Sequence, residues 1–543
     1  MRGFDINGGD EMSFMSRWIK VLGAGLLAGL VAALLMTVIQ ALMRLLLGVP
    51  LPGELGGDRF LPTFNVTDFL HLLKANGGTG GAKRKAFYSG FGGQLAFGVA
   101  FGMLYAFVTE IGRARNPERE RRFGVGPGSV LLVVISVIVI WTVSLAVLWP
   151  TLSTNNRGLT PALASITTGA GFLIVYASFG IALILIYRFI TNRRPLREST
   201  PVGEPIARRS FLAGAGGLVL AVASGGLIKK LHDDSTLLYD GKVYTGASVK
   251  HITPNDEFYV VTKNIIDPVV RKAAWRLRID GLVDNPRTYS FDDLASSMPS
   301  VKQEMTLECI SNHIGQGLMS NAIWTGVSLK KLVEAAGPKQ GAVDVILHAA
   351  DGYTHDVSFD KVMEETTLLA YEMNGEPLPD HHGYPVRALV PGYYGEGSAK
   401  WINRVEIFDR NVDDRYYGKQ GWIATHVSTT SQFDPDRFDP QLPAKVGKTT
   451  TLKGIAYSGD RGIDKVEVST DGGANWQEAK IDYSPSKIAW VFWSYDWTPK
   501  TSGDARLVVR ATDGEGKLQT PKVTPANPDG ASGFDRQRVP VKG

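Results

Sequence analysis

Cys309 is the only cysteine in a chain of 543 residues, and it stands in the segment Thr-Leu-Glu-Cys-Ile-Ser-Asn-His. A cysteine thiolate is a soft ligand that suits a soft metal centre. A lone cysteine is, however, more often a small buried hydrophobic residue than a ligand. It also cannot form a disulfide within the chain. Cys309 is therefore a candidate metal ligand whose assignment depends on the residues around it.

Four polar residues that follow Cys309 in the sequence are suited to holding an anionic group. Arg387 and Lys400 carry the charges that bind a phosphate, and His382 and Ser398 can add hydrogen bonds. Each has a simpler interpretation when it is taken alone. The two cations would then be the exposed end of a strand, and His382 an ordinary loop histidine.

The composition predicts several domains, one of them in a membrane. The chain is long enough for more than one domain at roughly 100–200 residues each. Hydrophobic residues make up 44% and charged residues 20% of it, but nearly all the long apolar runs fall in residues 1–230. The formal net charge is only +5, with no basic patch that alternates with aromatic residues. These features exclude a typical nucleic-acid-binding protein.

Five apolar segments without Asp, Glu, Lys or Arg predict a helical membrane domain over residues 1–230. A helix needs about 20 apolar residues to cross a bilayer, and the last segment is slightly shorter than that. One such segment could be a core helix of a soluble protein, but five in succession favour a membrane. The predicted spans are Val21–Met43, Ala86–Val108, Gly128–Trp149, Ala162–Tyr187 and Phe211–Ile228.

Arginine-rich loops follow the second and fourth spans, and such loops usually face the cytoplasm. This orientation puts the N-terminus inside and everything after the fifth span outside, although Lys83-Arg84-Lys85 then lies on the outer side. The pair Arg208-Arg209 before the fifth span resembles an internal twin-arginine export signal. The alternative is that these are two ordinary arginines that flank a membrane helix on its cytoplasmic side. The sequence thus predicts a multi-pass protein of the cytoplasmic (inner) membrane, with an extracytoplasmic soluble region.

The sequence offers no second redox centre. None of the nine histidines falls within a predicted span, so a haem held by two histidines in the helices is excluded. There is no cysteine cluster for an iron–sulfur centre and no Cys-x-x-Cys-His motif. The predicted spans lack ionisable residues, which argues against an ion or proton path. Any electrons must therefore be exchanged with a separate protein or a quinone.

Residues 237–426 predict a mixed α+β domain, because short alternating strands and glycine turns replace the apolar runs. The predicted elements are the strand Trp275–Asp284, the helix Leu329–Ala336 and the helix Lys361–Glu372. The predicted turns and helix ends are at Asn285-Pro286, Gly337-Pro338 and Asn374-Gly375.

Residues 427–543 predict an immunoglobulin-like β-sandwich, because short strands recur at regular spacing. The predicted strands are Thr449–Tyr457, Lys465–Thr470, Ala489–Thr498 and Arg506–Thr512. Asp471-Gly-Gly predicts a tight hairpin turn. Trp476, Trp490 and Trp493 are the expected large core residues.

The region from about Thr253 to Val539 resembles the sulfite oxidase family of molybdenum enzymes. The resemblance depends on a series of motifs in a shared order. They are Thr-Pro-Asn-Asp-Glu-Phe-Tyr from Thr253, the Cys309 segment, Ala-Tyr-Glu-Met-Asn-Gly-Glu-Pro-Leu-Pro from Ala370, His-Gly-Tyr-Pro-Val-Arg from His382, Val-Pro-Gly-Tyr-Tyr-Gly from Val390 and Ser-Ala-Lys-Trp from Ser398. The last region, with Val466-Glu-Val-Ser-Thr-Asp-Gly-Gly, is similar to the family's C-terminal dimerisation domain, which implies a homodimer.

The resemblance implies the cofactor and the residues that hold it. Cys309 would be the protein ligand of molybdenum, whose remaining ligands come from the dithiolene of molybdopterin and from oxygen. The implied catalytic residues are Cys309, His313 and Trp422. The implied cofactor-binding residues are Tyr259, Thr262, Lys263, Asp351, His382, Arg387, Ser398 and Lys400.

Three departures from the family pattern concern the substrate. Sulfite-oxidising members place arginines where this chain has Val261 and Ile314. Their pocket tyrosine corresponds to Trp422, with Tyr417 as a rival alignment. Each charged hydrogen bond lost from an anion site costs about 1.5–3 kcal/mol, so sulfite binding should be weakened. His313 and Lys263 could supply positive charge instead, which leaves anionic substrates, sulfoxides and other small oxo compounds open.

Together these observations predict a membrane-anchored molybdenum cofactor oxidoreductase that transfers an oxygen atom to or from a small substrate. A non-enzymatic scaffold or adhesion protein with a decayed cofactor pocket is the alternative. A transporter with a fused sensor is a third interpretation, weakened by the lack of ionisable residues in the spans. The scaffold would contain no molybdenum, whereas the enzyme would contain molybdenum and pterin in equal amounts.

Overall fold

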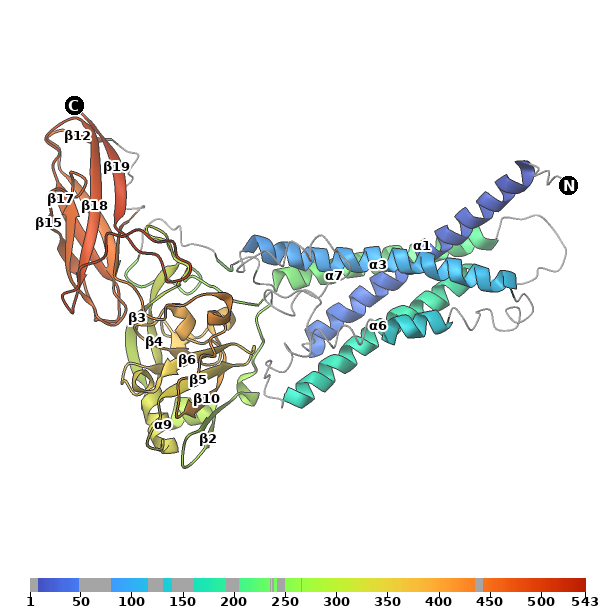
Figure 1. Ribbon diagram of the computed structural model, residues 1–543, viewed down its shortest axis with the longest axis horizontal. Helices are drawn as coiled ribbons and strands as arrows, with labels where there is room; N and C mark the ends of the chain where they lie inside the picture. The colour runs from blue at the N-terminus through green and yellow to red at the C-terminus, as the bar shows by residue number, and fades with distance from the viewer. Residues whose placement is uncertain are drawn as a thin grey trace. The chain divides into compact units, whose positions relative to one another are not determined.

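The computed structural model divides into two compact units, which are described separately (Figure 1). The helical unit comprises the chain up to Leu238 together with Lys263–Ile266, and the second unit comprises nearly all the rest. The structure describes residues 8–47, 80–115, 130–138, 161–191, 205–234, 236, 239–241, 250–264, 266–434 and 443–543.

The helical unit contains the long helices α1 Gly8–Leu47, α3 Gly80–Arg115, α6 Pro161–Thr191 and α7 Pro205–Asp233. Each contains a stretch that is long and apolar enough to cross a membrane, which is consistent with membrane anchoring. These stretches are Met15–Met43, Phe91–Ile111, Leu173–Thr191 and Phe211–Asp233. Of the predicted third span Gly128–Trp149, only 130–138 lies within the described residues, and that part is helical.

Small residues allow α1 and α3 to pack closely. An added Cβ at Gly29 would lie 2.0 Å from the carbonyl oxygen of Gly98, so only glycine fits there. Polar side chains are buried between the same helices: Gln94 donates to the side chain of Gln40, and Thr37 Oγ1 donates to Gln94 Oε1 at 3.3 Å. Close backbone approach and interhelical hydrogen bonds therefore hold this pair together.

The second unit begins with an α+β region built on two sheets. One sheet has the strand order β2-β1-β10-β5-β6, and the other has the order β3-β4-β7-β8 with β9 paired to β7. The strands are β1 Arg276–Gly281, β2 Arg287–Ser290, β3 Val301–Glu308, β4 Met319–Ser328, β5 Asp344–Ala349, β6 Thr354–Ser358, β7 Leu368–Met373, β8 Glu376–Pro377, β9 Arg387–Leu389 and β10 Ile402–Phe408.

Short helices connect these strands and cover the core. They are α8 Phe291–Ser297, α9 Leu329–Ala336 and α10 Phe359–Val362, with 3-10 turns η2 Lys272–Ala274, η3 Asp380–His382, η4 Gly395–Gly397 and η5 Gly418–Gln420. The predicted helix Leu329–Ala336 is confirmed: it buries Leu332 and Val333 and ends at Gly337, whose φ of 67° favours glycine. The predicted strand over Trp275–Asp284 is confirmed as β1 over its middle part.

The predicted helix Lys361–Glu372 is wrong. The chain forms the single helical turn α10 and then the strand β7, which pairs with both β4 and β9. Leu368, Leu369 and Ala370 are fully buried in this central position. Burial between two neighbouring strands therefore overrides the helix propensity of the Glu-rich segment.

The C-terminal part of the second unit consists of two packed sheets. Their strand orders are β11-β13-β17-β16 and β12-β19-β18-β14-β15, and both sheets contribute to one core that includes Leu452, Trp493 and Leu507. The strands are β11 Thr430–Phe433, β12 Ala444–Lys445, β13 Thr450–Tyr457, β14 Ile463–Ser469, β15 Gln477–Glu478, β16 Lys480–Tyr483, β17 Val491–Trp497, β18 Gly503–Asp513 and β19 Asp535–Lys542.

The four predicted C-terminal strands correspond to β13, β14, β17 and β18. Trp490 and Trp493 are buried as predicted, but Trp476 is not a core residue. Its ring is half-buried and lies 4.0 Å from the guanidinium carbon of Arg510. Trp476 follows the glycine loop at Asp471 before β15, where a cation–π contact replaces core packing.

Candidate active site around Cys309

Cys309 is the first residue after β3, where the ladder between β3 and β4 ends. The last pair of that ladder joins Glu308 to Met319. The amide of Cys309 then donates to the carbonyl of Leu318 at 3.0 Å, and the amide of Asn312 donates back to the carbonyl of Cys309 at 2.9 Å. This tight turn fixes the thiol at the edge of the sheet.

The thiol of Cys309 is half-buried, and its Sγ lies 3.0 Å from Ser311 Oγ. Burial raises the pKa of the thiol to about 11. Burial also raises the pKa of the adjacent Glu308 carboxyl to about 7, although a hydrogen bond from Asn312 Nδ2 lowers that pKa in part. A bound metal cation would favour the thiolate that this environment otherwise disfavours.

Tyrosine hydroxyls and two carboxyls lie around the thiol. Besides the adjacent Glu308, four side chains interact electrostatically with it: Tyr259, Tyr394, Tyr417 and Glu396. They come from three separate segments: residues 250–264 before β1, the η4 loop and the η5 turn. The immediate surroundings of Cys309 are thus rich in polar groups that can donate hydrogen bonds without carrying positive charge.

Arg387 lies at the start of β9 and is buried. Its Nη1 donates to the carbonyl of His382 at 3.2 Å and its Nη2 to the carbonyl of Ser398 at 3.0 Å. Burial lowers the pKa of the guanidinium to about 10, and its carbon lies 5.2 Å from the ring of Trp324. Within the described part of the chain, Arg387 Nε has no hydrogen-bond partner. A buried cationic donor of this kind requires an anionic or polar acceptor.

Lys400 and Gly383 complete the surroundings of Arg387. Lys400 Nζ donates to the carbonyl of His381 at 3.0 Å, and burial lowers its pKa. Gly383 has a φ of 112°, and a Cβ on it would lie 3.0 Å from the Cβ of Arg387 and 3.1 Å from that of Lys400. The close approach of the two cationic residues therefore requires glycine at this position.

His382 and Ser398 contact Arg387 and help to hold the loops around it. The buried His382 ring lies 2.9 Å from the carbonyl of Asn255 through Nε2, and burial keeps its pKa well below the usual value. The hydroxyl of Ser398 accepts a hydrogen bond from the amide of Val390 at 3.1 Å. Both side chains hold loop backbone in place, and the carbonyls of both residues accept from Arg387.

Tyr259 connects the cationic cluster to Cys309. Its hydroxyl interacts electrostatically with both Cys309 and Arg387. Its placement depends on a glycine, since a Cβ at Gly395 would lie 2.4 Å from that hydroxyl oxygen. The structure thus brings Tyr259, Cys309, Arg387, Lys400, His382 and Ser398 into one site.

Asp351 and Thr262 lie beside the cationic end of this site. Asp351 is buried, accepts the amide of Tyr353 at 3.0 Å and interacts electrostatically with Lys400. The amide of Thr262 donates to Asp240 and its hydroxyl to Asp267, and both aspartates also interact with Lys400. Lys263 belongs to the segment grouped with the helical unit, where its Nζ donates to Asn264 Oδ1 at 3.1 Å.

The two remaining candidates differ in their surroundings. The His313 side chain is exposed, and its carbonyl accepts the amide of Gln316. Trp422 packs in a cluster with Ile310 and Tyr394, and Tyr417 interacts electrostatically with Cys309. Sequence reasoning missed Tyr394 and Glu396 as neighbours of Cys309. Their only signal was the run of tyrosines and glycines from Tyr393 to Gly397.

The residues fit a molybdenum–pterin cofactor. The donor set of one cysteine sulfur, one buried arginine with an unused Nε in the described structure and one half-buried lysine matches a soft metal joined to a phosphate-bearing pterin. Cys309 would hold the metal, and Arg387 with Lys400 would hold the phosphate end.

Comparison with known proteins agrees with this chemistry. Residues 264–417 match the oxidoreductase molybdopterin binding domain, and residues 436–527 match the Mo-co oxidoreductase dimerisation domain. The sulfite oxidase of Gallus gallus is 29% identical over 321 residues, which cover 51% of this chain and 70% of that protein. An NADH nitrate reductase of Solanum lycopersicum is 27% identical over 322 residues, which cover 48% of this chain and 35% of that protein.

Among solved structures, the sulfane dehydrogenase SoxCD of Paracoccus pantotrophus is 26% identical, with a TM-score of 0.47 over 54% of this chain and 84% of that one. The match to the molybdopterin binding domain includes β9 and β10 and ends before Trp422. The match to the dimerisation domain begins after β11. The two domain matches and these relatives support a molybdopterin-dependent oxidoreductase of the sulfite oxidase family.

Proposed function

We propose that this protein is a membrane-anchored molybdenum enzyme that transfers an oxygen atom to or from a small, weakly charged oxo compound outside the cytoplasmic membrane. When bound, the molybdenum centre exchanges an oxygen atom with a substrate while its oxidation state changes by two electrons. The protein's share is to bind and orient the cofactor and the substrate and to exclude competing reactions. The observation that carries the proposal is the position of Cys309 at the edge of a sheet, joined through Tyr259 to the buried Arg387.

The substrate preference follows from the residues near the thiol. The two positions that carry arginine in sulfite-oxidising relatives are Val261 and Ile314 here, and neither can form an ion pair. The groups that interact with the thiol are instead tyrosines and the carboxyls of Glu308 and Glu396. Tyrosine hydroxyls can donate to the oxygen of a sulfoxide or an N-oxide, whereas a dianion would meet a carboxyl. A neutral oxo compound is therefore the better fit.

The helices and the C-terminal sheets support the rest of the proposal. Four helices with apolar stretches come before the catalytic unit in the sequence. Arg208-Arg209 lie near the start of the last helix, just before its apolar stretch Phe211–Asp233, as in a twin-arginine signal. The dimerisation-domain match supports a homodimer. Electrons would be exchanged with a separate protein or a quinone, because the sequence has a single cysteine and no motif for a second redox centre.

Two measurements on the purified full-length protein test this function. We expect about one molybdenum and one pterin per chain, and reduction of dimethyl sulfoxide by reduced methyl viologen. A folded protein without molybdenum and pterin would instead support the scaffold alternative. A fully loaded protein that oxidises sulfite but does not reduce dimethyl sulfoxide would overturn the proposed substrate preference.

Adding back the arginines should improve sulfite binding. In the double variant Val261→Arg/Ile314→Arg we expect the KM for sulfite, measured with ferricyanide as acceptor, to fall at least tenfold, since each charged hydrogen bond contributes about 1.5–3 kcal/mol. Val343→Arg is the matched control, because Val343 is an exposed apolar residue just before β5. An unchanged KM in the double variant would show that these two positions do not face the substrate.

A further inference from the structure

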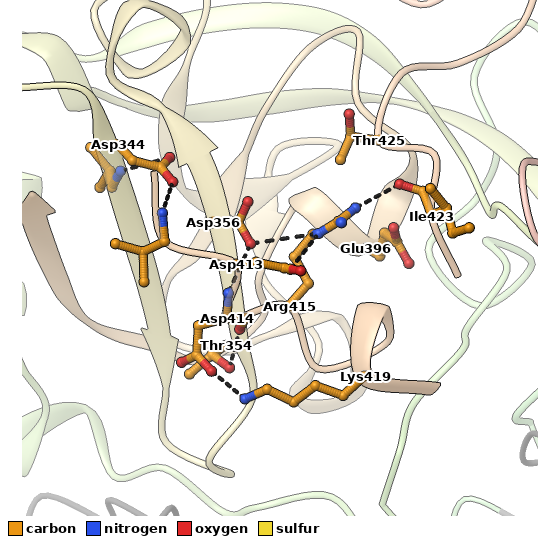
Figure 2. A network of polar contacts seen from close by, with 12 residues as sticks. Asp344, Thr354, Asp356, Glu396, Asp413, Asp414, Arg415, Lys419, Ile423 and Thr425 are labelled. Atoms are coloured by element: carbon orange, nitrogen blue, oxygen red, sulfur yellow. Dashed lines mark hydrogen bonds and ion pairs between the residues drawn. The ribbon is translucent and has the colours of Figure 1, made fainter. Parts of the chain in front are cut away.

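A carboxyl group with an unused oxygen lies beside the Cys309 site. Glu396 belongs to η4, and its side chain interacts electrostatically with the thiol of Cys309. Its Oε2 is buried and, among the described residues, has no hydrogen-bond partner. Figure 2 shows this carboxyl beside Arg415, with no hydrogen bond drawn to it. Tertiary structure rarely leaves a buried carboxyl oxygen unused unless water or a substrate completes its bonding.

Arg415 links Glu396 to the outside of the unit. Its Nε lies 3.6 Å from Asp356 Oδ1, and its Nη1 donates to the carbonyl of Ile423 at 2.7 Å (Figure 2). Ile423 is 61% exposed, whereas Asp356 and Arg415 are largely buried. Polar groups therefore run from the exposed segment at Ile423 through Arg415 to Asp356, and Arg415 also interacts electrostatically with Glu396.

His355 adds two further unused polar atoms to the same region. It is fully buried on β6 and interacts electrostatically with Arg415, and neither ring nitrogen has a hydrogen-bond partner in the described structure. β6 also contacts η4, which carries Glu396. Buried polar atoms without protein partners are the usual places for ordered internal water, which typically makes about three hydrogen bonds. The arrangement thus provides positions for water between charged side chains.

We propose that Glu396 is the proton-transfer group of the Cys309 site, and that water ordered by Arg415 and Asp356 connects it to solvent. This inference rests on the oxygen-transfer function proposed above. Reduction of an oxo compound XO consumes two protons and two electrons and gives X and water; the reverse reaction releases both protons. A one-electron carrier supplies the electrons in two steps, and the X–O bond breaks as the oxygen becomes water. Either direction requires a group that moves protons between solvent and the reacting oxygen.

The charges around Glu396 suit this task. Burial raises its pKa to about 7, with Arg415 opposing the shift and Asp356 adding to it. A carboxyl that holds its proton near neutral pH can both donate and accept it. The charged and titratable groups that face it are Cys309, Tyr353, Asp356, Arg415 and Tyr417.

The experiment compares Glu396→Gln with wild type and with Glu365→Gln, a surface carboxyl paired with Lys330. We expect kcat for dimethyl sulfoxide reduction by reduced methyl viologen to fall about 100-fold in Glu396→Gln, the usual contribution of a positioned proton donor, with KM changed less than about twofold. Wild-type kcat should fall as pH rises through the pKa of Glu396, and this dependence should vanish in the variant. Glu396→Asp should retain part of the rate.

A second readout does not depend on turnover. The infrared difference spectrum between dithionite-reduced and air-oxidised protein should contain a carboxyl band in wild type and Glu365→Gln that is missing in Glu396→Gln. Molybdenum and pterin contents should be equal in all three. An unchanged rate, pH profile and infrared band in loaded Glu396→Gln would refute the proton-transfer role alone, as would loss of cofactor from that variant, which would show a structural role. A wild type without molybdenum would refute the proposed function itself.

Discussion

Cys309→Ser should abolish dimethyl sulfoxide reduction while the protein remains folded. Serine keeps the shape of the side chain but replaces the soft sulfur by a hard hydroxyl oxygen, which is a poor ligand for a soft metal centre. Groups that only support a metal ligand already contribute about 10–100-fold to activity, so removal of the ligand itself should cost more than about 100-fold. The thiol is only half-buried at a strand end, so the melting temperature of the cofactor-free protein should change little.

Ser311→Ala is the matched comparison for this variant. The Ser311 hydroxyl lies 3.0 Å from Sγ, so its removal changes the surroundings of the sulfur without removing it. We expect an activity loss of about tenfold with full molybdenum content, because the hydroxyl is an outer-shell group. Turnover, metal content and thermal unfolding of both variants are the measurements. Undiminished turnover by purified Cys309→Ser would mean that the sulfur holds no catalytic metal.

Local signals in the sequence were sufficient for several elements of the fold. The helix Leu329–Ala336 could be predicted because its apolar residues recur on one face and a glycine ends it. The strand β7 could not, because Lys361–Glu372 has the composition of a helix and its part from Leu368 on is extended only through pairing with β4 and β9. Those partners are distant in the sequence, and no local pattern records them. Trp476 was misplaced for a similar reason: a large aromatic residue favours a core unless a cation such as Arg510 holds it at the surface.

The residues of the site also divide into those that local sequence motifs predict and those that only the folded chain reveals. Cys309, Arg387 and Lys400 could be predicted because the thiol and the two cations stand in sequence motifs whose order the family shares. Glu396, Arg415 and His355 could not, since their significance lies in unused buried atoms and in mutual proximity, which only the folded chain reveals. The motifs favour Trp422 over its rival Tyr417 as the pocket residue. In the structure Trp422 packs against the cluster that contains Ile310, and Tyr417 interacts electrostatically with the thiol, so both stay candidates.

Arg387→Met should release the pterin from the protein. The guanidinium is buried, its Nη atoms are engaged with two carbonyls, and Nε remains for an acceptor outside the described protein groups. A charge-assisted hydrogen bond to a phosphate contributes about 1.5–3 kcal/mol, so cofactor affinity should fall about 10–100-fold. The measurement is the pterin fluorescence and molybdenum content that survive gel filtration. Arg410→Met, which removes an exposed arginine paired with Asp409, should retain both.

The stability of the cofactor-free protein should change in the opposite direction. A buried guanidinium with an unsatisfied nitrogen destabilises the folded state, and a methionine of similar length removes that penalty. Cofactor-free Arg387→Met should therefore melt at the same temperature as cofactor-free wild type or higher, whereas wild type alone should gain stability on loading. A variant that loses the pterin and also unfolds more easily without it would show that Arg387 serves the fold. Retention of the pterin would exclude Arg387 from the cofactor site, and with it the connection through Tyr259 that joins the cationic cluster to Cys309.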